Sequence, residues 1–321
     1  TRLFTFSLID DELQQVRPFF NSSSIRENVN RRVFFPDGTY YYLPKQKNLH
    51  PIADGQTDDE VGVLFFQSAA DLSYPATLIT YTAHPLTVGD SSSLISADYP
   101  GVVRRIIEEN IGGTSLFANG ACGDNHPIGA ESGFTRCYDL GKTIAEKALF
   151  HRWDSVQLND SPIRYGYFDI NLPCLTEEEF NQLPSNFDTV FSHIDNPSIV
   201  DGYISTEFYL LALGPLVFIG VPAEVTAELG FRMKWDSPFP KTYIMYLGTD
   251  ALGYLTHENA YSWGGYEVLT SIFSRSAGRI LGDAVAKAAR DMWDELKVGG
   301  YVPLMPRAGA GRAPENDMGS Q

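Results

Sequence analysis

The sequence predicts a layered α/β domain in which a mixed β-sheet is flanked by helices. Two short apolar runs, at residues 61–66 and 76–82, are rich in β-branched and aromatic residues, as buried strands are. A stretch with helical apolar spacing follows them, over about residues 98–111. The second half of the chain repeats this alternation with more antiparallel character, which indicates one layered fold.

The first half of the chain also contains a turn signal and three later elements. Asp37-Gly38 lies between two aromatic runs and predicts a hairpin. Asp98 is expected to cap the N-terminus of the helix that follows the two buried strands. The predicted elements in order are strands at 33–35, 40–42, 61–66 and 76–82, a helix from 98 to about 111, a strand at 115–118, a loop at 119–127 and a helix over about 138–153.

The second half begins with a strand and ends with a long amphipathic helix. Thr176 and Glu179 form a capping box, and Gly214-Pro215 predicts a tight turn between two strands. The predicted elements are strands at 165–172, 208–213, 216–221 and 242–247 and helices over 224–234 and about 267–296. From residue 299 the composition shifts to Gly, Pro, Ala and Arg, so we expect one domain over 1–298 and a disordered tail over 299–321.

Composition excludes several classes of partner. The 321 residues carry a net charge of -16, which argues against nucleic acid because phosphate binding needs clustered cations. The same charge argues against non-specific docking on anionic membranes. No apolar run reaches the roughly 18 residues of a membrane span. The three cysteines match no zinc-ribbon spacing, and the sequence leaves the oligomeric state open.

Polar side chains follow four of the predicted strands or apolar runs, where α/β folds build their sites. They lie in the segments 82–85, 119–127, 221–224 and 253–257. Each has an ordinary structural explanation: His84 as a core histidine, Glu224 as a carboxylate at a helix N-terminus, and Tyr254 as a packed aromatic. His257 is a candidate for the wall of the same pocket, and Asp124 for orienting a ligand. Separately, none of these residues identifies a site.

Together, these segments resemble the neutral ceramidase family, which comprises zinc-dependent amidases that split ceramide into sphingosine and a fatty acid. The resemblance covers about residues 27–296. Its most specific element is Gly253-Tyr254, followed twelve residues later by Tyr266-Glu267. The matching segments are NRR at 30–32, DEVGVLFF at 59–66, YTAHP at 81–85, ISADYPG at 95–101, FANGACGD at 117–124, VPAE at 221–224, GY at 253–254 and GYE at 265–267.

The resemblance implies a metal site and a reaction. The family holds one zinc ion (Zn2+) with two histidines, a glutamate and a tyrosine, which implies His84, Glu224 and Tyr254 as ligands here. Such ligands should converge within about 4 Å of one point, because zinc–ligand bonds are about 2 Å long. Arg31 and Tyr266 are implied to hold the polar head of the substrate and the developing oxyanion. The implied activity is hydrolysis of a linear amide in N-acylsphingosine or another small or lipid-like N-acyl amine.

Two departures from the family pattern leave alternatives open. The family's other histidine ligand lies in a His-Thr-His segment, which this sequence does not contain. The matched region is therefore interpreted as a ceramidase-like catalytic domain without its N-terminal segment. With three of the four ligands it would bind zinc weakly or not at all, which leaves open whether this part is active on its own. The alternatives are a hydrolase of the same fold with another ester or amide substrate, and a binding module that has lost full zinc ligation.

The second departure is His126, which occupies the place of a serine that is catalytic in the family. An imidazole there could serve as general base toward zinc-bound water, donate to the amide oxygen, or only fill the loop. The resemblance also favours a secreted or extracytoplasmic location and transient contact with membranes.

Overall fold

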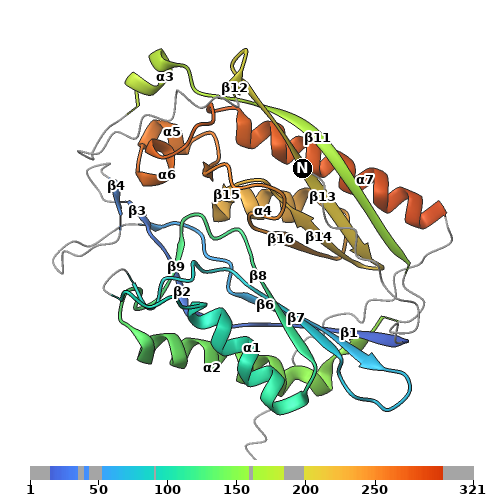
Figure 1. The fold of residues 1–321 in the computed structure, drawn as a ribbon. Helices are drawn as coiled ribbons and strands as arrows, with labels where there is room; N and C mark the ends of the chain where they lie inside the picture. Colours follow the sequence, from blue (N-terminus) through green and yellow to red (C-terminus); the bar gives the residue numbers. More distant parts are fainter. Residues whose placement is uncertain are drawn as a thin grey trace, which may run out of the picture.

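The computed structural model describes residues 15–34, 40–42, 53–89, 92–158, 162–183 and 199–298. These residues form four layers, in which two helices, two face-to-face sheets and further helices follow one another (Figure 1). The layered α/β class is confirmed, and the strands divide between two main mixed sheets.

The first sheet has the strand order β10-β1-β6-β7-β8. Strands β7 and β8 run parallel and are joined by helix α1, whereas the other pairs are antiparallel. Helices α1 and α2 cover the outer face, where Phe65 and Ile79 pack with Ile107 and Ile144 in one buried cluster. The bounds are β1 (Val16–Ser24), β6 (Glu60–Ser68), β7 (Ala76–Tyr81), α1 (Asp98–Ile111), β8 (Thr114–Asn119), α2 (Phe134–Phe150) and β10 (Val156–Gln157).

The second sheet repeats the same arrangement. Strands β13 and β14 form an antiparallel hairpin, and β14 runs parallel to β16 after the crossover helix α4. Helices α4 and α7 cover its outer face, where Leu210 and Ile219 pack with Leu281 and Val285 (Figure 1). The bounds are β11 (Ile163–Pro173), β12 (Ile199–Val200), β13 (Tyr203–Leu213), β14 (Leu216–Gly220), α4 (Ala227–Asp236), β16 (Lys241–Met245) and α7 (Ala277–Val298).

The two sheets pack against each other through an apolar layer. Phe20 and Leu64 of the first sheet pack with Leu216, Phe218 and Tyr243 of the second. Burying this apolar area stabilises the sandwich by roughly 25 cal/mol for each Å² removed from water.

The described residues also form three small sheets. Strand β2 (Asn28–Asn30) pairs with β9 (Asn125–Pro127), and β15 (Glu224–Val225) pairs with β17 (Tyr254–Leu255). The third is formed by β3 (Arg32–Phe34), β4 (Tyr40–Tyr42) and β5 (Ala53–Asp54). The remaining elements are a 3-10 turn (His151–Asp154), α3 (Glu177–Asn181), α5 (Ala260–Trp263) and α6 (Tyr266–Leu269).

Most predicted elements are confirmed, including the capping box. Thr176 Oγ1 accepts from the Glu179 N–H, and the Glu179 carboxylate accepts from the Thr176 N–H. Strands β3 and β4 pair as predicted, while the turn at Asp37-Gly38 lies outside the described residues. The tail over 299–321 also lies outside them.

Three local predictions were wrong. The predicted helix 267–296 is two helices, α6 and α7, because Phe273 leaves the helical path and bridges to Cys174. Asp98 is the first residue of α1 and not its N-cap, and its carboxylate accepts from Thr87 Oγ1 and from the Val88 and Tyr99 N–H groups. Glu224 belongs to strand β15, and α4 begins three residues later. Within the described residues, no helix is long and apolar enough to cross a membrane.

Candidate active site

The two parallel strand pairs, β7–β8 and β14–β16, end at one edge of the sandwich. In α/β folds, this edge beyond the carboxyl ends of parallel strands is where ligands bind. A cavity of about 750 Å³ lies there, with walls from both sheets. It is lined by Arg31, His84, Pro85, Leu86, Phe117, Ala118, Asn119, Tyr209, Glu224, Met245, Tyr246, Leu247, Gly248, Tyr254 and Tyr266.

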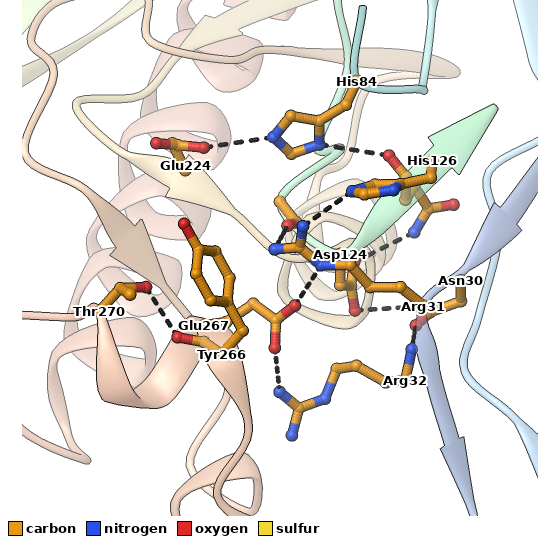
Figure 2. Close-up of polar contacts among 12 residues, drawn as sticks. Asn30, Arg31, Arg32, His84, Asp124, His126, Glu224, Tyr266, Glu267 and Thr270 are labelled. Atoms are coloured by element: carbon orange, nitrogen blue, oxygen red, sulfur yellow. Dashed lines mark hydrogen bonds and ion pairs between the residues drawn. The ribbon is translucent and has the colours of Figure 1, made fainter. Parts of the chain in front are cut away.

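His84 and Glu224 lie next to each other in the lining of this cavity. His84 follows β7 and Glu224 follows β14, and His84 Nε2 lies 3.3 Å from Glu224 Oε2 (Figure 2). His84 Nδ1 lies 3.3 Å from the Asn125 carbonyl oxygen. A carbonyl oxygen only accepts, so Nδ1 carries a proton and Nε2 is the nitrogen presented to the cavity.

Tyr254 joins this pair through the small parallel sheet. It stands opposite Glu224 in the register of β15 and β17, and its hydroxyl donates to the Glu224 carboxylate. Its ring stacks on His84 with centroids 6.4 Å apart. The structure therefore brings together the three residues proposed as zinc ligands from sequence, although they come from three separate segments.

The polar groups here shift one another's pKa values. Burial opposes ionisation of Glu224, but hydrogen bonds from His84, Tyr246 and Tyr254 lower the pKa of its carboxyl. Burial disfavours the charged form of His84, yet Cys122 and Glu224 outweigh it and raise the imidazole pKa to about 10. Burial raises the pKa of the Tyr254 phenol, against the nearby cation of Arg31.

Tyr246 is a site residue that the sequence analysis did not single out. It is the first residue after β16, and its hydroxyl donates to Glu224 Oε2 and lies 3.3 Å from His84 Nε2. The sequence contained the relevant pattern, because the other candidate residues were selected as polar side chains that follow the end of a strand. It was hidden because the strand was predicted to extend to residue 247.

Arg31 also lines the cavity and is held by three buried acceptors (Figure 2). Its Nε donates to Glu267 Oε1 at 2.5 Å, its Nη1 to His126 Nε2 at 2.8 Å and its Nη2 to the Gly123 carbonyl at 2.8 Å. The second oxygen of Glu267 accepts from Arg32 Nη1 at 2.6 Å. Burial opposes the charge on Glu267, but the two arginines lower its pKa.

His126 is buried beside Arg31. A guanidinium only donates, so His126 Nε2 accepts and the ring proton of the neutral form is on Nδ1. Burial and the Arg31 cation lower its pKa to about 3. His126 is therefore neutral near pH 7, and its Nε2 lone pair is already used by Arg31.

The remaining predicted residues divide between the cavity and its surroundings. Tyr266 lines the cavity, with its ring 5.0 Å from Arg31 Cζ and 5.4 Å from the Tyr254 ring. Asp124 supports the loop, accepting from Asn30 Nδ2 and from the Ala227 N–H at the start of α4. His257 pairs with Glu228 at 2.9 Å and is not part of the cavity wall.

The donor atoms in the cavity are of the chemical types that bind a metal ion. One imidazole nitrogen, one carboxylate and two phenol oxygens form the mixed N/O set that Zn2+ accepts. Among the described residues, no group of three or more His, Cys, Asp or Glu side chains could hold a metal, so any such site depends on the tyrosines. His84, Glu224 and Tyr254 could hold the ion.

Comparisons with known proteins place the fold. The chain is similar to the neutral ceramidase from Pseudomonas aeruginosa, with a TM-score of 0.63 at 16% identity over 88% of this chain and 53% of that one. It is also similar to a ceramidase complexed with C2, with a TM-score of 0.62 at 14% identity over 92% of this chain and 55% of that one. The chain thus spans about half the length of these proteins. No protein-family profile and no curated protein matches it. At these identities the likeness shows a ceramidase-like fold.

Proposed function

We propose that this chain carries the site of a zinc-dependent hydrolase that cleaves the linear amide of an N-acyl amine, with N-acylsphingosine as the leading substrate. One observation carries the proposal. Three donors, His84 Nε2, the Glu224 carboxylate and the Tyr254 hydroxyl, lie together in the lining of a cavity that also contains the Arg31 guanidinium, 5.4 Å from the Tyr254 ring centroid. The ceramidase-like fold supports the same reaction class.

Two sets of residues would serve different roles in amide hydrolysis, one binding the metal ion and the other the amide oxygen. His84, Glu224 and Tyr254 would hold the zinc ion, which when bound polarises a carbonyl and lowers the pKa of water. Arg31 and Tyr266 offer a cation and a phenol beside Tyr254, where they would hold the amide oxygen as negative charge develops. Arg31 arrives already oriented by Glu267, His126 and Gly123, so little reorganisation accompanies catalysis.

The shape and lining of the cavity suit an acylated substrate. Leu86, Phe117, Met245 and Leu247 supply apolar wall next to the polar cluster. An acyl chain can bury its methylene groups there, each contributing about 0.8 kcal/mol. The volume of about 750 Å³ is in the range of pockets that bury most of a small lipid-like ligand.

Fatty-acid release from N-acylsphingosine by the purified chain, before and after chelation and zinc addition, tests this proposal. We expect zinc-dependent release that His84→Ala abolishes. His257→Ala is the matched control, since His257 is a partly buried histidine outside the cavity, and it should retain activity. The proposal fails if the chain binds zinc but releases no fatty acid, or if chelation leaves the release unchanged.

A further inference from the structure

We propose that Tyr246 is a further donor to the metal ion, so that His84, Glu224, Tyr246 and Tyr254 supply four donors, and water or the substrate carbonyl would add a fifth. The inference rests on the proposed metal-dependent function and adds a residue to its site. With Tyr246 included, the described residues would supply four donors to the ion.

The backbone on both sides of Tyr246 fixes its position. Its N–H donates to the Asn119 carbonyl at the end of β8, which ties the end of the second sheet to the first. Two residues later, the Gly248 N–H donates to the Val221 carbonyl. A Cβ at Gly248 would lie 2.7 Å from Gly220 Cα, so the turn is closely packed. Tyr246 therefore leaves the strand at a fixed place.

The side-chain geometry supports coordination. The Tyr246 hydroxyl lies 3.3 Å from His84 Nε2, and the same nitrogen lies 3.3 Å from Glu224 Oε2. Four donors arranged tetrahedrally at bonds of about 2.0–2.1 Å from zinc are about 3.3 Å apart. The hydroxyl also donates a hydrogen bond to Glu224 Oε2, so the three atoms are in mutual contact.

Tyr209 shows that a tyrosine on this cavity wall need not point toward the donors. Its hydroxyl donates a hydrogen bond to Sδ of Met245 at 3.1 Å, and Met245 is the residue before Tyr246 in the sequence. Both phenols line the same cavity. Replacing Tyr209 with Phe removes a hydroxyl from the cavity wall only. Replacing Tyr246 with Phe removes a hydroxyl at the proposed metal position.

The donor set indicates the kind of ion. One nitrogen and three oxygens without a thiolate favour a borderline or hard divalent cation such as Zn2+ or Co2+ over a soft one such as Cu(I). Two phenolates and a carboxylate would place much negative charge at the ion. The Arg31 cation, 5.4 Å from the Tyr254 ring centroid, would offset part of it.

Metal binding by Tyr246→Phe, with Tyr209→Phe as control, tests the assignment in the full chain. Zinc affinity is measured by competition with a chromophoric chelator, and the ligand set by the visible spectrum of bound Co2+. Residues that only orient a ligand typically cost 10–100-fold in affinity, so we expect Tyr246→Phe to weaken zinc binding by more than about 100-fold. We also expect its Co2+ spectrum to change, while Tyr209→Phe matches the wild type in both.

An unchanged Co2+ spectrum in Tyr246→Phe would overturn the assignment, and so would a wild-type chain that binds neither zinc nor cobalt. The amide-hydrolysis assay keeps this result separate from the proposed function. If Tyr246→Phe loses zinc but the wild type releases no fatty acid, the ligand assignment stands and the proposed function fails. If the wild type is active and Tyr246→Phe binds zinc equally well, the assignment fails and the function stands.

Discussion

Glu267 and Arg31 form a fully enclosed ion pair, with side chains 0% and 2% exposed and Oε1 2.5 Å from Nε. The other oxygen of Glu267 binds Arg32, so one carboxylate serves two consecutive buried arginines. Because α6 carries Glu267 and the segment β2–β3 carries the arginines, the pair joins parts of the chain more than two hundred residues apart. The ion pair with Glu267 fixes the position of the Arg31 guanidinium, which lines the cavity.

Replacing Glu267 with Gln should therefore destabilise the protein strongly. Two buried guanidinium groups would lose their counter-charge, and breaking a buried pair in this way costs about 3–5 kcal/mol. Urea unfolding measures the change. Asp291→Asn is the matched control, since Asp291 pairs with Lys287 at the surface and should change stability by less than about 1 kcal/mol. Equal stability of the two variants would show that the arginines find other partners.

His126 is expected to act through Arg31 and not as a titrating base. With a pKa near 3, it stays neutral across the usual assay range, so it cannot produce an acidic limb between about pH 5 and 7. His126→Ala should reduce turnover by roughly 10²-fold through loss of the Arg31 contact, with the acidic limb in place and zinc content unchanged. The pH dependence of kcat checks this. Disappearance of the acidic limb in the variant would identify His126 as the base.

The local strand pattern could be predicted from sequence, but the meeting of the strand ends could not. Short apolar runs fix which residues form β7 and β14, because their side chains need a buried environment. Nothing in that pattern says that two separate sheets pack with their parallel pairs ending at one edge. Only the family resemblance linked His84 to Glu224 and Tyr254 before the structure placed them together.

Element boundaries explain what sequence reasoning missed. Tyr246 was predicted to lie inside a strand that ends one residue before it, so its position beside the cavity was hidden. Glu267 was predicted to start a long amphipathic helix, where a first-turn carboxylate has an ordinary role. Its burial follows from the break between α6 and α7, a tertiary effect that apolar spacing does not reveal.

A second ionic cluster should make stability depend on pH. Glu60 on β6 accepts from Lys241 Nζ at 2.6 Å and from the Tyr243 hydroxyl at 3.0 Å, both on β16 of the facing sheet. Burial raises its pKa, but Lys234 and Lys241 outweigh that and lower it below its ordinary 4.5. A lowered pKa stabilises the fold above the unfolded-state value, and this stability is lost as pH falls through the folded value.

Glu60→Gln should therefore be less stable than the wild type near pH 7, and the difference should shrink below about pH 4. Urea unfolding at several pH values measures this. Glu109→Gln, which removes an exposed i,i+4 partner of Arg105, should show little difference at any pH. A Glu60→Gln deficit that stays constant down to low pH would mean that packing, and not charge, is responsible.

Gly123 connects the loop after β8 to the strand that carries Glu224, and it should not tolerate even a methyl group. Its N–H donates to the Val225 carbonyl, and its own carbonyl accepts from Arg31. A Cβ there would lie 2.7 Å from the Glu224 carbonyl oxygen and 2.9 Å from the Val225 carbonyl, which are backbone atoms that cannot rotate away. The loop and β15 would have to separate, moving Glu224 and the acceptor of Arg31 together.

We therefore expect Gly123→Ala to destabilise the protein by about 1–3 kcal/mol, the usual range for overpacking, and to weaken zinc binding.

Gly282→Ala is the control. Gly282 lies within α7, where a Cβ would meet only the end of the Arg232 side chain at 3.6 Å. Alanine in a helix interior should stabilise by about 0.5–1 kcal/mol and leave zinc affinity unchanged, because α7 does not line the cavity. Thermal unfolding and chelator competition on both variants decide the matter. If Gly123→Ala keeps wild-type zinc affinity despite reduced stability, the contact with β15 does not set the position of Glu224.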